Sequence, residues 1–332
     1  MTPLALAPLP LGLTVIRATA ATLVVAALVA LPAFGNPFLV TQFSRVLIYA
    51  IFAMSLDLLV GYCGLVSLGH AAFFGIAAYV TALLSDKAEI SNILVTLPVS
   101  VTAAAFGALV IGAFALRTSG VYFIMVTLAF AQMLYFVAQE NAFFGGSDGI
   151  LLLVPFRLGL GDSTWLPLGD RATRYYLILS MALLVLCFLS FLVRSPFGCV
   201  IRGIRSNERR MRALGYAVGR YKLVCFVIAG AFAGLAGHLY VVLTSLADPS
   251  ILDWLHSAQV LLMLIIGGIG TLIGPALGAF VLIVLTDQAS ELTEHWKLVV
   301  GVVVIALTLF SRGGIVGLAR SGTASLFERK PA

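Results

Sequence analysis

The feature that most limits the fold of this chain is its series of long apolar runs. A run of about 20 apolar residues forms a helix about 30 Å long, which matches the hydrocarbon core of a bilayer. Of the 332 residues, 61% are hydrophobic and only 10% are charged, whereas soluble domains usually contain about 25% charged residues. We therefore predict an all-α, polytopic transmembrane helix bundle of about nine to ten spans that forms one membrane domain over residues 1–332. The predicted spans are residues 18–34, 45–61, 65–84, 92–116, 120–138, 172–193, 223–246, 258–275, 276–287 and 297–311.

The distribution of Lys and Arg predicts how the helices are oriented. Residues 194–222 contain eight of the twenty Lys and Arg residues, and basic residues gather on the cytoplasmic side of membrane proteins. If this segment is cytoplasmic, counting the crossings places fourteen basic and two acidic residues inside, and six basic and eleven acidic residues outside. Both termini are then cytoplasmic. Membrane topology accounts for the net charge of +6, and we expect no nucleic-acid partner.

Residues 140–171 form the longest predicted external segment. They contain GGSDGI and LGLGDSTWLPLGD, and Gly, Asp and Pro favour turns. We expect an external loop with a short interfacial helix. Such a loop is either a linker or a surface that receives a soluble partner.

Two glycine-rich stretches predict helices that break inside the membrane. GYCGLVSLGHAAFFGIAAY covers residues 61–79, and GGIGTLIGPALGA covers residues 267–279. Glycine costs about 1 kcal/mol and proline about 3 kcal/mol in a helix interior, and non-helical backbone at membrane depth must face protein or a water-filled cavity. Small residues also allow close helix contact. The stretches therefore mark either tight helix contacts or, since one lies in each half of the chain, a solute pathway.

Few polar residues accompany these glycines. A carboxylate inside a membrane usually faces protein or water, so Asp57 either serves the pathway or caps the broken region. His70 is either a hydrogen-bonded structural residue or a gate or ligand. Arg17 and Arg45 are placed at span ends, where they can reach the interface, and are assigned no role. The candidate pathway residues are Asp57, Gly61, Gly64, Ser67, Gly69, His70, Gly267, Gly268, Gly270, Thr271 and Gly274.

The basic segment 194–222 is patterned as two short helical pieces at the membrane surface. Pro196 and Gly198 mark the exit from the preceding span, Ser206 or Asn207 can serve as an N-cap, and Gly215 ends the second piece. The segment is a topology signal alone, an amphipathic helix bound to anionic lipid, or a docking element for a cytoplasmic partner. The defined cap and stop favour docking. The candidate docking residues are Arg202, Arg205, Asn207, Glu208, Arg209, Arg212, Leu214 and Gly215.

Four long motifs, in the same order and over residues 45–312, carry a resemblance to a known family. They are GYCGLVSLGHAAFFGIAAY, SGVYFIMVTLAFAQM followed by FFGGSDGI, RSPFGCVIRGIRSNERRMRALGYAVGRYK followed by AGAFAGLAGHLY, and GGIGTLIGPALGA. The chain resembles the permease subunit of a branched-chain amino acid ATP-binding-cassette importer. The resemblance implies a bacterial inner-membrane location and a role for 194–222 as a coupling segment docked on an ATPase. Glu208, Ala213 and Gly215 keep parts of the family's Glu-Ala-Ala signature, whereas Arg209, Arg210 and Met211 replace its small residues.

The resemblance also implies partners. These are a second permease subunit, two cytoplasmic ATP-binding subunits and a periplasmic or extracellular amino-acid-binding protein, all around a permease embedded in membrane lipid. The chain has no GxxxxGK[ST] loop, which cradles phosphates in such ATPases, so we expect ATP and Mg to bind the partner ATPase and no cofactor or metal to bind this chain.

The sequence leaves other functions open. Related permeases carry urea or short amides, and no residue excludes these solutes. An ion-coupled secondary transporter needs an ionisable pair within its spans, where only Asp57 is available. A membrane enzyme needs a constellation such as His with a carboxylate, and the four histidines show no HxxxH spacing.

Overall fold

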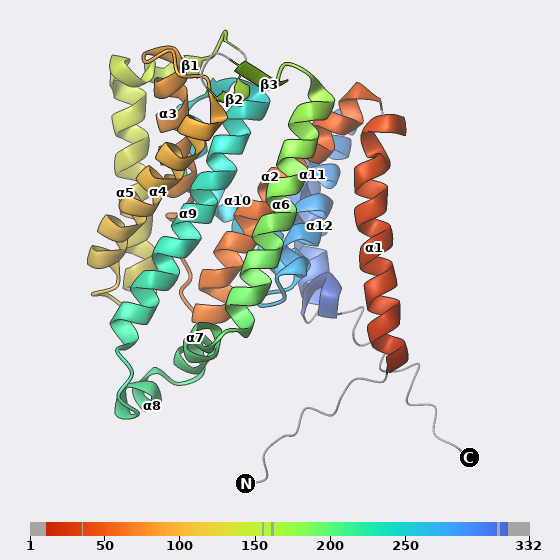
Figure 1. The fold of residues 1–332 in the computed structure, drawn as a ribbon. Coiled ribbons are helices and arrows are strands. Elements are labelled where there is room, and N and C mark those ends of the chain that lie inside the picture. The colour runs from red at the N-terminus through yellow and green to blue at the C-terminus, as the bar shows by residue number, and fades with distance from the viewer. Residues whose placement is uncertain (1–10, 35, 155, 161–162, 311–312, 318–332) are drawn as a thin grey trace.

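The structure is a computed structural model that describes every residue except 1–10, 35, 155, 161–162, 311–312 and 318–332. The described chain is a bundle of helices with two small two-stranded sheets at one end (Figure 1). Both chain termini, which the charge pattern predicts to be cytoplasmic, lie outside the described residues.

The elements follow one another along the chain in a simple order. The α-helices are α1 (Leu11–Phe34), α2 (Pro37–Asp57), α3 (His70–Asp86), α4 (Ile93–Ala115), α5 (Val121–Glu140), α6 (Arg171–Arg194), α7 (Pro196–Ser206), α8 (Glu208–Ala213), α9 (Val218–Thr244), α10 (Trp254–Gly267), α11 (Ile273–Leu292) and α12 (Trp296–Phe310). A π-helix, η1 (Leu58–Cys63), continues α2, and 3₁₀ turns form η2 (Ala142–Phe144), η3 (Gly146–Asp148) and η4 (Pro249–Leu252). The strands are β1 (Ile150–Leu151), β2 (Arg157–Leu160), β3 (Ser163–Pro167) and β4 (Leu246–Ala247).

The apolar helices confirm the predicted fold class. Within the described residues, six helices are long and apolar enough to cross a membrane, and four shorter apolar helices accompany them. Each of the ten predicted spans corresponds to one of these helices. Hydropathy locates these helices because a long apolar run must lie against lipid or against other apolar residues.

Three predicted boundaries are wrong: α2 begins at Pro37 and not at residue 45, and the other two lie at the glycine-rich stretches. No helix ends at residue 275, because the chain leaves helical geometry at 268–272. Gly268 and Gly270 adopt φ values of 114° and 79° there, which glycine tolerates without steric cost. Pro275 lies in the first turn of α11, where its missing N–H would have no helical partner. The span predicted from residue 65 begins instead at His70.

The core lies around α2. Its most apolar window, including η1, is 94% buried, whereas those of α4, α5 and α6 are 28%, 22% and 33% buried. A helix that is apolar on all faces is buried at the centre of a bundle, and α2 contacts α6, α9, α10 and α11. Small residues bring α3, α4 and α9 together: a Cβ at Gly237 would overlap the backbone of Phe74. Because α4, α5 and α6 are mostly not buried within the bundle, their apolar side chains can face lipid.

The two ends of the bundle differ. Strands β2 and β3 form an antiparallel hairpin with an irregularity between Leu158 and Gly159, and β1 pairs with β4. These strands lie at one end, and α7 and α8 lie at the other (Figure 1). The segment 140–171 therefore contains 3₁₀ turns and a hairpin where the sequence predicts only a loop and a short helix.

Candidate functional site

The first interrupted region begins where α2 passes into the π-helix η1. Gly64 ends this helix with φ of 79°, and its N–H donates to the Leu59 carbonyl. Residues 64–69 are not helical, and the Ser67 Oγ accepts from the Gly69 N–H at 3.2 Å. A Cβ at Gly69 would overlap the Thr127 carbonyl of α5. The glycines here therefore permit a turn and a close approach to a neighbouring helix.

The second interrupted region separates α10 from α11. The Thr271 Oγ1 donates to the Gly268 carbonyl at 2.7 Å and accepts from the Gly274 N–H at 3.0 Å. A Cβ at Gly267 would overlap the Gly274 carbonyl. Thr271 thus caps the start of α11, while two glycines let the helix ends touch.

The two interrupted regions meet at Asp57, the last residue of α2. Its Oδ1 accepts from the Gly270 N–H at 2.7 Å, and its Oδ2 accepts from the Leu272 N–H at 3.1 Å. Asp57 is fully buried. A break in a helix leaves backbone N–H groups without partners, and burying them unpaired is costly. The Asp57 carboxylate satisfies two such N–H groups, which belong to a turn more than 200 residues away in the sequence.

Arg205 of α7 joins the same site. Its Nη1 donates to the carbonyl of Gly61 in the π-helix. A Cβ at Gly61 would overlap the Asp57 Oδ1 and lie 2.6 Å from the Gly270 N. One contact chain therefore runs from α7 through η1 to the turn at 268–272. We call Asp57, Gly61, Arg205 and Gly270 the junction.

His70 lies apart from the junction in a buried aromatic cluster. Its Nε2 is 2.9 Å from the Ser55 Oγ, and its ring stacks on Phe52 with centroids 5.5 Å apart. Phe52 also stacks on His256 of α10, and the Ser257 Oγ accepts from the Ala71 N–H. These contacts tie the start of α3 to the start of α10.

The basic segment has a defined shape. The Asn207 Oδ1 accepts from the Arg210 N–H at 2.9 Å, so Asn207 is the N-cap of α8. Gly215 follows α8 with φ of 86°. Glu208 pairs with Arg212 and with Lys222 of α9, each at 2.6 Å. Partial burial opposes its ionisation, but hydrogen bonds from these two cations outweigh that effect and hold the pKa of Glu208 below its usual value.

The outer surface of this segment is basic and also exposes apolar side chains, of which Leu214 is the most exposed large one. Arg209 and Arg212 are exposed, and Leu214 is 66% exposed. Arg202 turns back along α7 to the Gly198 carbonyl and the Cys199 sulfur. Beneath them, Ile201 and Ile204 are buried. We call Arg209, Arg212 and Leu214 the α8 surface.

Three contacts in the bundle, two of them at these sites, could not be predicted from neighbouring residues in the sequence. Leu272 supplies a donor to Asp57, Lys222 pairs with Glu208, and Arg45 pairs with Asp287 at 2.5 Å. The placement of Arg45 at a span end is wrong, because α2 begins at Pro37 and Arg45 lies inside it, where the carboxylate from α11 compensates its charge. In each case the partner is distant in sequence or on another element.

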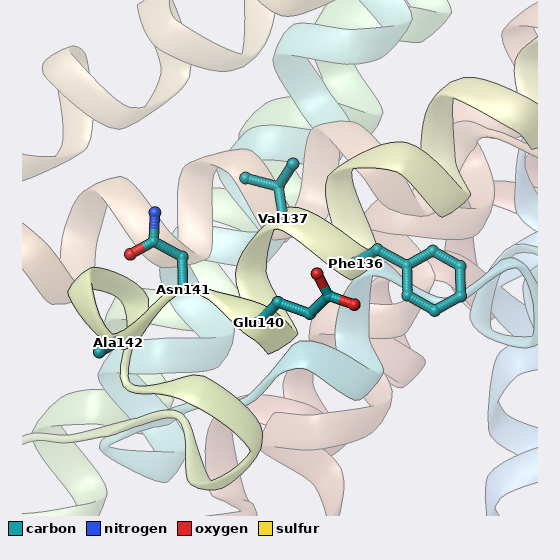
Figure 2. A pocket seen from close by; sticks show the side chains of 5 residues that line it. All are labelled: Phe136, Val137, Glu140, Asn141 and Ala142. Carbon is teal, nitrogen blue, oxygen red and sulfur yellow. The ribbon is translucent and has the colours of Figure 1, made fainter.

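A separate pocket of about 410 Å³ lies at the end of α5. Figure 2 shows its lining residues, Phe136, Val137, Glu140, Asn141 and Ala142. None of the predicted pathway residues lines it. Among the described residues, no group of three or more His, Cys, Asp or Glu side chains is arranged to hold a metal ion.

Comparison with known proteins matches most of the chain to one family. The family model described as "Branched-chain amino acid transport system / permease component" matches residues 38–309. The chain belongs to this family of permeases. The matched region of the permease includes Asp57, both interrupted regions and the segment α7–α8. With ten apolar helices in the part of the chain that the structure describes, the permease is a multi-pass membrane protein.

Individual relatives agree with the family. The permease is 29% identical over 293 residues to the high-affinity branched-chain amino acid transport system permease protein LivM of Escherichia coli (strain K12), covering 82% of this chain and 69% of that protein. It is 28% identical over 308 residues to LivM of Salmonella typhimurium, covering 86% and 72%. A probable branched-chain amino acid transport permease LivM of Methanocaldococcus jannaschii is 24% identical over 265 residues, covering 70% and 75%. No solved structure matches the chain.

Proposed function

We propose that this chain forms the translocation path of an ATP-binding-cassette importer for branched-chain amino acids. Its family and its relatives carry that transport function in their descriptions. In this proposal the permease lies in the bacterial inner membrane beside a second permease subunit. Two cytoplasmic subunits bind ATP and Mg, and an external binding protein delivers the solute.

The orientation follows from charge. The end of the bundle that carries α7 and α8 holds the basic segment 194–222, and we assign it to the cytoplasm because Lys and Arg favour that side. The strands and the segment 140–171 at the opposite end then face outward (Figure 1). This orientation sets the α8 surface against the ATPase and the hairpin β2–β3 toward the binding protein.

The junction is the observation that carries the proposed mechanism. Arg205 belongs to the segment that docks on the ATPase, and it holds the carbonyl of Gly61. Gly61 in turn lies against the turn at 268–272, which Asp57 holds. ATP binding can shift a two-state equilibrium only through different contacts in the two states. A displacement of α7 changes contacts with both interrupted helices at once.

The geometry of Asp57 favours a structural role over ion coupling. Both of its oxygens accept hydrogen bonds from backbone N–H groups. A carboxylate that carried a coupling ion or proton would have to release these donors inside the bundle, where leaving each one unpaired costs about 1–3 kcal/mol. We therefore assign Asp57 to holding the turn, and the driving force to the separate ATPase.

Co-purification from native membranes tests this proposal. The tagged permease should bring with it an ATP-binding subunit and a second permease. The variant Arg209→Glu with Leu214→Ala changes only exposed side chains of the α8 surface and should lose the ATPase while keeping the second permease. Arg157→Glu, exposed at the opposite end, is the matched control and should keep both. Equal recovery of the ATPase with all three proteins would contradict docking through α8.

A further inference from the structure

A second pocket lies between the starts of α2 and α6 and the end of α9. Its volume is about 420 Å³, and its wall includes Pro37 and Phe38 of α2, Arg171 and Arg174 of α6, and Leu243 of α9. None of these residues belongs to the junction or to the α8 surface. The pocket therefore needs an explanation of its own.

Two arginines give this pocket a positive charge that the protein does not compensate. Within the described residues, neither Arg171 nor Arg174 forms an ion pair. The Arg174 Nη1 donates to the Leu243 carbonyl at 3.3 Å, which fixes its guanidinium against α9. Its Nε is shielded from solvent and has no hydrogen-bond partner among the residues that the structure describes. A buried donor without a partner is costly, and an anion in the pocket would satisfy it.

The acidic residues of the surrounding elements do not fill this role. Asp170, next to Arg171, accepts from the Thr173 hydroxyl at 3.4 Å. Asp287 of α11 is paired with Arg45 and Gln42. The hydroxyls of Thr41 and Ser44 in the pocket wall donate to carbonyls of their own helix. Among the side chains of the pocket wall, the free donors are thus those of the arginines.

Helix geometry adds to the attraction for an anion. Both α2 and α6 begin at the pocket. The first N–H groups of a helix lack helical partners, and the helix dipole places positive charge there. Anions bind at such positions when other donors converge on them. Here two helix starts and two guanidinium groups converge.

The depth of the pocket identifies the class of anion. Pro37 and Arg171 are the first residues of two of the candidate membrane spans, so the pocket lies at the level of lipid headgroups. Phe38 in its wall is 63% exposed. Aromatic side chains are enriched at this interface, and Phe38 offers contact to an acyl chain. Basic pockets between membrane helices bind anionic headgroups on the cytoplasmic side, and the same pairing of guanidinium donors with an apolar wall is present at this end of the bundle.

We propose that this pocket binds the phosphate of an anionic phospholipid, with Arg171 and Arg174 as its donors and Phe38 against an acyl chain. Free inorganic phosphate shares the headgroup chemistry but lacks the apolar contacts. The bound lipid would join α2, α6 and α9 at the end of the bundle opposite α7 and α8. The inference does not depend on which solute the permease carries.

Lipid titration of the full-length permease tests this proposal. The purified chain in detergent is titrated with short-chain phosphatidylglycerol, short-chain phosphatidylcholine or inorganic phosphate, and binding is followed by native mass spectrometry and by thermal stability. Phosphatidylglycerol should bind and raise the melting temperature. Phosphatidylcholine and inorganic phosphate at equal concentration should do so at least tenfold more weakly. Equal binding of both lipids, or of inorganic phosphate alone, would overturn the proposal.

Two variants locate the site. Arg171→Gln with Arg174→Gln should weaken phosphatidylglycerol binding about 30-fold, since each basic residue contributes about 1 kcal/mol near a membrane surface. Arg117→Gln with Arg157→Gln removes the same charge from exposed positions elsewhere and should bind as the unaltered chain does. Because Arg174 also contacts Leu243, Arg171→Gln alone is a second variant that leaves that contact intact and should still weaken binding. Unchanged affinity in both Arg171 variants would refute the site.

Discussion

Gly61→Ala is the substitution that most sharply probes the junction. An added Cβ would overlap the Asp57 Oδ1 and lie 2.6 Å from the Gly270 N, so either α2 and the turn at 268–272 separate or Asp57 turns away. Overpacking costs about 1–3 kcal/mol, and losing a hydrogen bond to a charged group costs about 1.5–3 kcal/mol. We expect the free energy of unfolding to fall by about 3–5 kcal/mol.

The assay compares Gly61 with a helical glycine that has open space around it. Gly219 lies in the first turn of α9, and a Cβ there meets nothing within 4 Å. Gly219→Ala should change the free energy of unfolding by less than about 1 kcal/mol, in the stabilising direction. Unfolding of the full chain in mixed micelles gives both values. If Gly61→Ala were as harmless as Gly219→Ala, the close contact at the junction would be refuted.

The remaining predictions concern coupling, pH and capping. Arg205→Ala should lower ATP-driven uptake by the assembled complex at least tenfold while ATP hydrolysis continues, because it removes a charge-assisted hydrogen bond worth about 1.5–3 kcal/mol. The control is Arg220→Ala, at an exposed position. Equal uptake in the two variants would show that Arg205 does not take part in coupling. Burial alone would raise the pKa of Glu208, but its ion pairs with Lys222 and Arg212 have the larger effect and hold the pKa below the ordinary 4.5. The stability that these ion pairs contribute is therefore complete above pH 4.5 and is lost as the pH falls through the lower pKa of the folded state. Hydrogen exchange over 207–222, corrected for intrinsic rates, should rise only below pH 4.5, and a rise near neutral pH would contradict this. Thr271→Val should destabilise the chain by about 1 kcal/mol because it removes the cap of α11, whereas Thr271→Ser should not, and equal unfolding free energies for the two variants would argue against the cap.

The helices could be predicted from sequence because the signal is local. An apolar run of sufficient length must lie in a membrane or a core whatever its neighbours, and Asn207 and Gly215 mark the ends of α8 through their own backbone preferences. The glycine-rich stretches likewise predict that helices break. Which glycine adopts positive φ depends on contacts with the rest of the bundle, and for that reason the break lies at 268–272 and not after Pro275.

The junction itself could not be predicted, because its contacts join distant segments. Asp57 and Gly270 are separated by 213 residues, and Arg205 and Gly61 by 144. The sequence leaves two roles for Asp57, pathway or cap, and the Gly270 and Leu272 donors that favour the cap are known only from the fold. The ion pair of Arg45 and Asp287 could not be predicted for the same reason. Taken alone, each of these residues looks like a charge at the membrane interface.

The most direct test of the account is solute uptake by reconstituted vesicles. Vesicles that contain the permease with its ATPase, second permease and binding protein should accumulate leucine only when ATP is supplied on the α7–α8 side. Vesicles that contain the permease alone should show no concentrative uptake under a proton or sodium gradient. Accumulation by the permease alone would contradict the claim that a separate ATPase, acting through Arg205 and the junction, moves the interrupted helices.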